Sequence, residues 1–447
     1  RSEVGGLTRL KLYAGGDIGD GQAQALEGQL VFAGDDPPVL HALAKGWVET
    51  RAFGPFGELL PQIMPTEQEY SDWVQKQVKQ KLDPWAEPIH GCVSDPGATG
   101  NQPDFGTVVM RPDLLLGDPR RLPAIRRSIY QEACRPTHFR EQDKAPVTLP
   151  NHPNLITHRG RPHWRAGNWI DTLGKPRAYL TRTAHAPSNR VWSGHDNEHW
   201  SVNYLCAYAL TTGDRWAIAE CHHKTELWLS QFTTKTGTYN DNPGPARAVG
   251  RGLLAGCWLY LVTGREEIRA RILTRYSDLR PHMAKPRAKE VKLRVLAPRW
   301  AKDRGHYWPP WEEGMAVTSL MAVHHLFGVT DAKTLAIELS DLITMHAFGR
   351  VNGSWRIGYK IPFQHGNGKV YIPDNDPEWA TKYAAGGGLT TWGLAAVVVA
   401  AEHSGRTDVR ARAAEILKQQ LADMSGTSDR LQWVCVSGSA VAYVGQQ

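Results

Sequence analysis

Hydrophobic positions recur with helical spacing in four long segments of the chain from Asn197 onward. The segments are His199–Gln231, Gly250–Leu279, Glu312–Phe348 and Gly388–Met424. In each, an apolar stretch rich in small residues ends at a glycine-containing turn (T-G-D, T-G-R, G-V-T-D or S-G-R-T-D), and a more charged stretch follows. Glycine favours the left-handed C-cap of the first helix, and Asp or Thr caps the second. The pattern predicts four helical hairpins.

The two helices of each predicted hairpin differ in how much surface they must bury. The first is apolar on nearly all sides, whereas the second has one apolar stripe. In the last hairpin this stripe consists of Val409, Ala413, Ile416, Leu417, Leu421 and Met424. Inner and outer helices that alternate in this way give an α/α toroid or a solenoid. The connections between hairpins span roughly twenty to forty residues, which favours a toroid with functional loops on one rim.

The first part of the chain has a different pattern. Short β-prone runs occur at Leu7–Tyr13, Ala25–Phe32, Lys45–Phe53 and Thr107–Leu116, separated by Gly- and Pro-rich turns. They predict a small antiparallel β-sandwich-like domain over residues 1–117. Residues 118–196 are rich in Pro and His and predict an irregular linking segment on the rim. The fold class is therefore mainly α, with a complete or incomplete α/α toroid domain over residues 197–447.

The composition is that of an ordinary globular protein, with 41% hydrophobic and 22% charged residues. No run of eighteen apolar residues occurs, so we expect no membrane span. The chain opens on Arg1, as a processed N-terminus would, and we expect an extracellular or periplasmic location rather than a cytoplasmic one.

Six cysteines are present, and none belongs to a C-x-x-C pair that would indicate a zinc site. Cys206, Cys221 and Cys257 fall within predicted helices, where buried thiols are common. We expect buried thiols rather than a disulfide framework, because a core of this size needs no covalent cross-links.

Tryptophan and basic residues indicate the chemistry of the partner. Many of the 17 Trp lie in connections beside His, Asp and Arg, which suits sugar rings, although Trp also fills large cores. The net charge is +7, and the segment 280–304 alone holds nine basic and two acidic residues. An acidic polysaccharide or oligosaccharide is the expected partner. We expect no nucleic acid, since no recognised nucleic-acid motif accompanies the charge. A solvated basic loop is the alternative.

The hairpin pattern of residues 197–424 resembles the α/α toroids of polysaccharide lyases and six-hairpin glycosidases. A β-rich unit before a helical toroid also resembles the layout of some exo-acting rhamnogalacturonan lyases. The resemblance implies a toroid and a carbohydrate-active enzyme. It does not distinguish lyases from hydrolases, because such toroids host both. This chain shows four clear hairpins rather than six.

If the first helices all point the same way, the loops before them converge on one rim. The first loop contains Trp192, His195, Asn197, Glu198 and His199. The second contains Tyr239, Arg247 and Arg251, the third His306, Tyr307, Trp308, Trp311 and Glu313, and the fourth Trp355 and His365. Arg247 and Arg251 share a helix face and suit a ligand carboxylate, or else salt bridges to the neighbouring acidic loop. The first loop suits either a site or an elaborate N-cap.

Two mechanisms compete for this rim. A lyase removes the C5 proton of a uronic acid, with Asn197, Arg247 and Arg251 on the carboxylate. His199, His306 and Tyr307 would then transfer protons. A hydrolase needs two carboxyl groups that flank the glycosidic bond, and the candidates are Asp196 or Glu198 with Glu312 or Glu313. The arginines favour the lyase. A sugar-binding or surface structural protein without activity is the third reading.

No cofactor is expected. The segment Asp374–Glu378 offers oxygen ligands that would suit a structural calcium ion, but it lacks the spacing of a known calcium loop, which favours a plain turn.

Overall fold

The computed structural model describes residues 202–231, 246–284, 299–301, 305–362 and 387–423, with short pieces at 2–4, 7–9, 22–23, 68–69, 72, 89–90 and 129. The long described ranges hold the four predicted hairpins. Their helices are α6 (Asn203–Thr212) and α7 (Arg215–Gln231), α8 (Ala246–Thr263) and α9 (Glu266–Ala284), α10 (Pro310–Phe327) and α11 (Thr330–His346), and α13 (Gly387–His403) and α14 (Thr407–Asp423). The prediction of four hairpins is confirmed, with ends that shift by a few residues.

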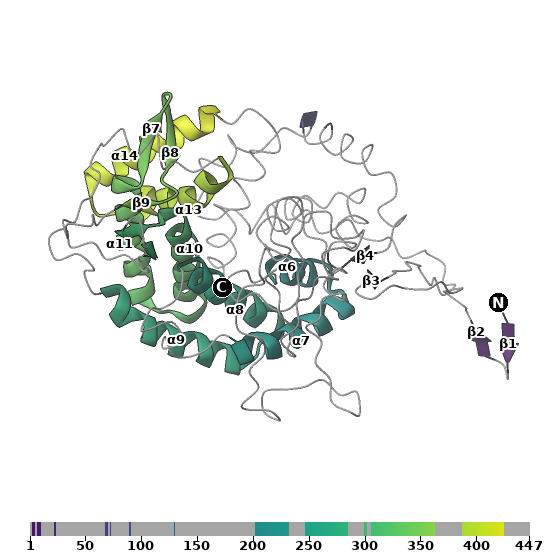
Figure 1. The fold of residues 1–447 in the computed structure, drawn as a ribbon. Coiled ribbons are helices and arrows are strands. Elements are labelled where there is room, and N and C mark those ends of the chain that lie inside the picture. The colour runs from purple at the N-terminus through teal and green to yellow at the C-terminus, as the bar shows by residue number, and fades with distance from the viewer. Residues whose placement is uncertain are drawn as a thin grey trace.

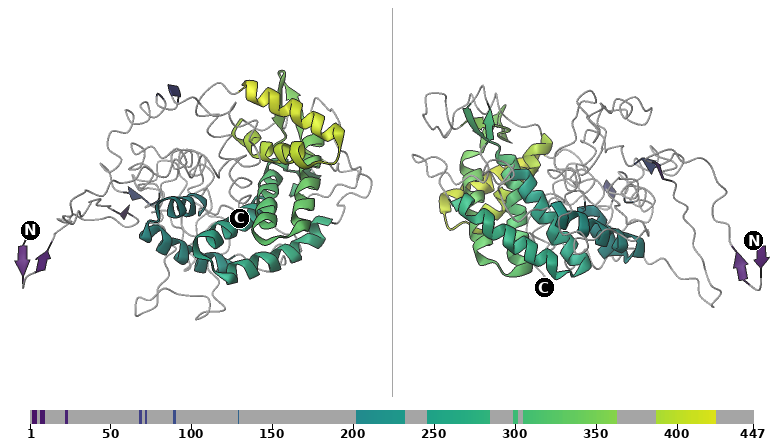
Figure 2. Two further views of the ribbon diagram at one scale, coloured as in Figure 1. Left: turned by 180° about the vertical axis from the view of Figure 1, so that it is seen from behind. Right: turned by 60° about the horizontal axis from the view of Figure 1, so that its bottom comes forward.

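The hairpins follow one another along an arc (Figure 1). The first helices α6, α8, α10 and α13 pack in order against one another, and α7, α9, α11 and α14 lie outside them. Figure 2 shows the same arc from behind and from below. In the ranges that the structure describes, the arc is open. The fold is therefore mainly helical, and closure into a toroid stays a prediction.

Glycine ends three of the first helices, as the turn sequences predict. Gly213, Gly264 and Gly328 have φ between 63° and 68°, and each donates its backbone N–H to a carbonyl four residues earlier. Asp214 then caps α7, because its Oδ1 accepts the backbone N–H of Trp216 at 2.9 Å. The last turn differs. Ser404 Oγ accepts the Arg406 backbone N–H there, and Gly405 does not adopt a left-handed conformation.

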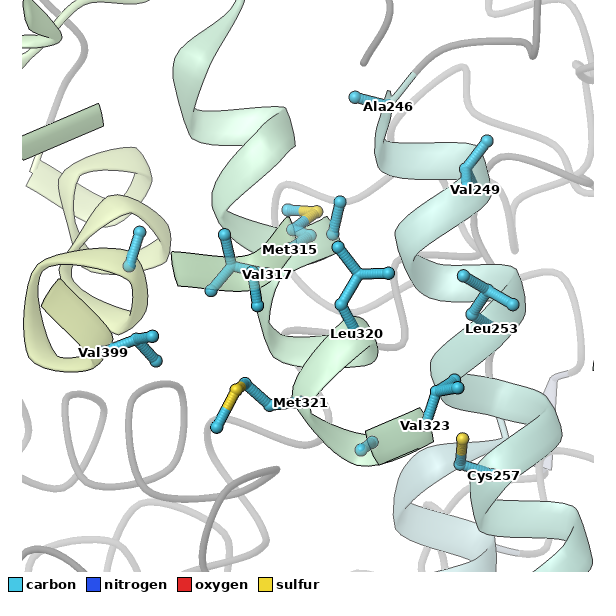
Figure 3. Packing of buried hydrophobic residues seen from close by; sticks show 14 of the residues in the cluster. Ala246, Val249, Leu253, Cys257, Met315, Val317, Leu320, Met321, Val323 and Val399 are labelled. Atoms are coloured by element: carbon cyan, nitrogen blue, oxygen red, sulfur yellow. The ribbon is translucent and has the colours of Figure 1, made fainter. Parts of the chain in front are cut away.

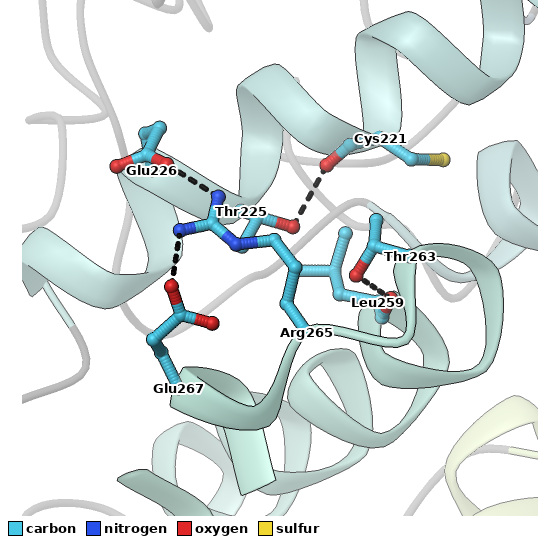
Figure 4. Close-up of polar contacts among 7 residues, drawn as sticks. All are labelled: Cys221, Thr225, Glu226, Leu259, Thr263, Arg265 and Glu267. Carbon is cyan, nitrogen blue, oxygen red and sulfur yellow. Dashed lines mark hydrogen bonds and ion pairs between the residues drawn. The ribbon is translucent and has the colours of Figure 1, made fainter. Parts of the chain in front are cut away.

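The turn between α8 and α9 is tied to the preceding hairpin. Arg265 donates hydrogen bonds to Glu226 of α7 and to Glu267 of α9 (Figure 4). This half-buried guanidinium, with its two carboxylate partners, joins the turn to α7 and to the first turn of α9.

The contrast between inner and outer helices is confirmed by burial. Every residue of α10 from Pro310 to Val323 is buried, and so is every residue of α13 from Gly393 to Ala400. On α14 the described stripe residues are buried, namely Val409, Ala413, Ile416 and Leu417. The core of the arc lies between α8, α10 and α13 (Figure 3), where Leu253 and Leu320 are each 1% exposed.

Two small sheets flank the inner helices. β5 (Arg299–Ala301), β6 (Gly305–Trp308) and β9 (Ile361–Pro362) form an antiparallel sheet in the order β5-β6-β9. β7 (Phe348–Val351) and β8 (Ser354–Ile357) form a hairpin, whose turn residues Asn352 and Gly353 both have positive φ.

Little of the first 201 residues is described. The short pairs β1 (Ser2–Val4) with β2 (Leu7–Arg9) and β3 (Gln22–Ala23) with β4 (Ile89–His90) are antiparallel. The predicted β-sandwich-like domain and the linking segment otherwise lie outside the described residues, so these domain boundaries stay predictions. None of the described helices is long and apolar enough to cross a membrane.

Titratable side chains gather where α10 and α13 end. His403 Nε2 lies 3.6 Å from Glu402 Oε2, and the rings of His324 and His325 are 5.0 Å apart. Burial raises the pKa of Glu402 to about 7. Burial, together with the nearby His324, Lys333 and His403, lowers the pKa of His325 to about 4. These opposite shifts give the fold a dependence on pH.

We predict that the Glu402→Gln variant gains stability over the wild type as pH rises. The folded protein holds the Glu402 proton up to about pH 7, whereas the unfolded chain releases it near 4.5. The wild type therefore loses stability across that window, and the amide does not. Thermal unfolding at pH 5 and pH 8 measures this. The melting temperature of the variant minus that of the wild type should be larger at pH 8 than at pH 5. An equal difference at both pH values would contradict the prediction.

Candidate functional site

The first turns of α8 and α10 lie side by side. The two helices run in the same direction, with Ala246 at one end of the contact and Cys257 and Val323 at the other (Figure 3). Gly250 permits the close approach, because a Cβ built there would lie 2.8 Å from the backbone nitrogen of Ala316. Parallel helices bring their N-termini together, and with them the residues that the sequence places at the start of these two helices.

Four charged side chains are buried at this end. Arg247 Nη1 of α8 lies 3.8 Å from Glu312 Oε1 of α10. Arg251, one turn further along α8, and Glu313 of α10 are also buried, and none of the four is more than 8% exposed. The sequence leaves two partners open for the arginines, a ligand carboxylate or a salt bridge to an acidic segment of the protein. Arg247 has the second kind of partner, because Glu312 lies within ion-pair range. The separation is within ion-pair range but longer than a hydrogen bond.

Aromatic rings connect this charged cluster to the solvent. The rings of Trp311 and Tyr359 are stacked, with centroids 5.8 Å apart and planes 7° from parallel. Trp311 Nε1 donates to the Tyr359 carbonyl oxygen at 3.2 Å. The Arg247 guanidinium lies 5.9 Å from the Trp311 ring centroid. Trp311 is buried, whereas Tyr359 is 40% exposed, so the stack runs from the surface to the buried arginine.

The three-stranded sheet brings the third and fourth loops together. β6 carries His306, Tyr307 and Trp308 directly before α10, and it pairs with β9, in which Ile361 lies opposite Trp308. Tyr359 and Lys360 precede β9, and the Lys360 ammonium lies 5.3 Å from the Tyr359 ring centroid. Trp308 is buried, and its Nε1 has no hydrogen-bond partner among the described residues.

Trp355 has a different setting. The guanidinium groups of Arg350 and Arg412 both contact its ring, at 4.7 and 4.9 Å from the ring centroid. Gln420 Nε2 donates to the Trp355 carbonyl oxygen at 2.7 Å. The contacts that the structure describes for Trp355 thus join the β7–β8 hairpin to α14. They support a packing role for this residue, which the sequence predicts to bind substrate.

The other predicted site residues lie outside the described residues. They are Trp192, His195, Asn197, Glu198, His199, Tyr239 and His365. The Asp374–Glu378 segment and most of the basic segment 280–304 lie outside them as well. Within the described ranges, no group of three or more His, Cys, Asp or Glu side chains could hold a metal ion.

Tyr359 is the site residue whose role the sequence does not reveal. It is one of several aromatic residues of the fourth loop, and its pairing with Trp311 depends on the β6–β9 contact. A local pattern does not reveal a contact between residues 48 positions apart.

Comparisons with known proteins add a distant structural resemblance. No family model matches the chain, and no curated protein matches it. A solved structure described as a polysaccharide lyase aligns with a TM-score of 0.44 and 11% sequence identity, covering 88% of this chain and 98% of that chain. The likeness is too distant to carry a function over to this chain.

Proposed function

We propose that this protein is a carbohydrate-active enzyme that binds an acidic polysaccharide where α8 and α10 begin and cleaves it by β-elimination at a uronic acid. The observation that carries the proposal is buried Arg247, which lies beside the Trp311–Tyr359 stack, together with buried Arg251 one turn further along α8. Cationic groups and a sugar-sized aromatic surface at the same end of two parallel helices suit a charged sugar.

Elimination needs strong neutralisation of the substrate carboxylate. The C5 proton is weakly acidic, so the carboxylate must be paired with cations before the proton can leave. Arg247 and Arg251 are shielded from water, where a positive charge acts more strongly than at the surface. The N-termini of α8 and α10 add partial positive charge at the same end. Glu312 would hold the Arg247 guanidinium against the Trp311 ring until a substrate carboxylate approaches.

Proton transfer is assigned to residues next to this cluster in the chain. His306 and Tyr307 lie on β6, immediately before Trp308 and α10. His199 precedes α6 in sequence and is the third candidate. Histidine and tyrosine suit a base that removes the C5 proton and an acid that protonates the leaving oxygen.

The hydrolase alternative has less support. It needs two carboxyl groups on opposite sides of the glycosidic bond. Glu312 and Glu313 are adjacent on one helix, and Glu312 faces Arg247. Their proposed counterparts Asp196 and Glu198 lie outside the described residues.

A panel of acidic and neutral polysaccharides tests the proposal. New reducing ends and the ultraviolet absorbance of a C4–C5 double bond are followed in parallel. The proposal expects both signals with at least one uronate-containing polymer. Reducing ends without absorbance would favour the hydrolase. Binding without either signal would favour a non-catalytic protein, and both of these outcomes overturn β-elimination.

We predict that the Tyr359→Ala variant raises KM by about 3- to 10-fold with little change in kcat. The exposed ring is proposed to contact a sugar that is bound away from the reacting atoms, and such a contact contributes roughly 0.5–1.5 kcal/mol. Tyr359→Phe keeps the ring and should retain most of the affinity. Leu210→Ala, which removes a comparably exposed hydrophobic side chain from α6, is the matched control. An unchanged KM in Tyr359→Ala would remove this ring from the site.

A further inference from the structure

Two buried sulfur atoms face each other inside the first hairpin. Cys206 of α6 and Cys221 of α7 have their Sγ atoms 3.7 Å apart, and both residues are 0% exposed. Cys257 of α8 is the third described cysteine, and burial raises its pKa well above the usual range. Within the described residues, no cysteine sulfur is paired with Cys257. The Cys206–Cys221 contact is therefore the one described place where two thiols are close enough to react with each other.

We propose that Cys206 and Cys221 form a disulfide bond that ties α6 to α7. The sulfur atoms must approach by about 1.7 Å to reach bonding distance, so the bond requires rotation about χ1 and a shift of the helices. The backbone around Cys221 is regular helix, and Thr225 donates its hydroxyl to the Cys221 carbonyl oxygen at 2.9 Å (Figure 4). The turn at Gly213 and Asp214 already holds the two helices antiparallel, so the bond adds to an existing contact.

The reaction is thiol–disulfide exchange with a small-molecule disulfide such as oxidised glutathione. One cysteine thiolate attacks the oxidant, forms a mixed disulfide and releases one glutathione thiolate, which takes up a proton. The second cysteine thiolate then attacks the mixed disulfide, forms the Cys206–Cys221 bond and releases the second glutathione. Two protein thiols are oxidised and one glutathione disulfide is reduced. Because both sulfur atoms are buried, the exchange takes place before the hairpin packs or while it opens.

The bond would matter most for the first loop. Cys206 follows His199 by seven residues in the sequence. A disulfide that fixes the position of α6 would therefore fix the helix to which the first loop connects. A disulfide that closes a short loop acts chiefly by restricting the unfolded chain, and it persists in oxidising compartments. This proposal is independent of the reaction proposed for the site.

Peptide mass mapping tests the bond directly. The full chain is prepared in two ways, by secretion into an oxidising compartment and by refolding in a glutathione redox buffer. It is then alkylated and digested without reductant. The expected result is a Cys206–Cys221 linked peptide that has lost two hydrogen atoms, with Cys257 alkylated after unfolding. If both preparations leave Cys206 and Cys221 alkylatable, or pair them mainly with other cysteines, the proposal is overturned.

A stability measurement provides the second readout. Reduction of the linked wild type should lower its melting temperature by about 3 to 8 °C, as expected for a short loop closed by a disulfide. The Cys206→Ser and Cys221→Ser variants should show no such dependence on reductant, whereas Cys257→Ser should keep it. A shift of the same size in the Cys206→Ser variant would contradict the assignment.

Discussion

Replacing Arg251 with glutamine is expected to lower kcat/KM on the cleaved polysaccharide by about 100-fold or more. The side chain is a buried cation on α8, one turn beyond the ion pair of Arg247 with Glu312. Removing a cation that stabilises developing negative charge in a shielded site costs about 100- to 1,000-fold in rate. Arg251→Lys keeps the positive charge but loses the planar guanidinium group. Its activity should therefore lie between that of the wild type and that of Arg251→Gln.

The control for this variant is Arg275→Gln. Arg275 is equally buried, but it lies on the outer helix α9 and pairs with Asp278 at 2.8 Å. Both variants lose a buried guanidinium, so both should lower the melting temperature. Only Arg251→Gln should lose activity in protein that is still folded, as judged by circular dichroism. Equal losses of activity in the two variants would mean that Arg251 acts through stability alone.

Replacing Gly250 with alanine is expected to lower the free energy of unfolding by about 2 to 3 kcal/mol, through overpacking. The new Cβ would lie 2.8 Å from the backbone nitrogen of Ala316 and 2.9 Å from the carbonyl carbon of Met315. Backbone atoms in the buried stretch of α10 do not move aside as the end of a long side chain does. The clash outweighs the gain in helix propensity of alanine over glycine, about 1 kcal/mol.

Gly405→Ala is the matched substitution in open space. No atom lies within 4 Å of a Cβ built at Gly405, and its φ is not positive. Urea unfolding followed by far-ultraviolet circular dichroism compares the two variants. Gly250→Ala should shift the midpoint to clearly lower urea, and Gly405→Ala should stay close to the wild type. A neutral Gly250→Ala variant would show that α8 and α10 are not packed this closely.

The hairpins could be predicted because their signals are local. Helical periodicity and glycine before an acidic or hydroxyl residue predict helices that end and restart, as seen at Gly213 with Asp214. The sequence signal for the start of α8 is less clear. Glycine at position 250 looks like a helix start, but α8 begins at Ala246, directly after Pro245. Gly250 instead serves a contact with α10 that no local pattern reveals.

The β7–β8 hairpin has a local sequence signal of its own. Asn352 and Gly353 stand between two short runs of β-prone residues, the strongest short-range pattern for a tight hairpin turn. In a segment that the helical pattern leaves as a connection between hairpins, a tryptophan suggests a ligand contact, and the sequence therefore predicts that Trp355 binds substrate. In the structure its ring is held by Arg350 and Arg412.

The composition of the candidate site could be predicted, but its pairings could not. Arg247 and Glu312 both stand at helix starts in the sequence, and their ion pair requires that α8 and α10 be adjacent and parallel. The Trp311–Tyr359 stack requires the β6–β9 pairing in the same way. Both are long-range contacts, set by how the hairpins pack rather than by the order of residues within any one of them.

The most direct test of the central claim compares one polysaccharide in two chemical forms. A uronate-containing polymer that the protein cleaves is assayed beside the same polymer after its carboxylates have been reduced to alcohols, with double-bond absorbance as the readout. If the arginines on α8 neutralise a uronate for β-elimination, the product should form with the first polymer and be absent with the second. Comparable cleavage of the reduced polymer, or reducing ends without double bonds from the first, would contradict the account.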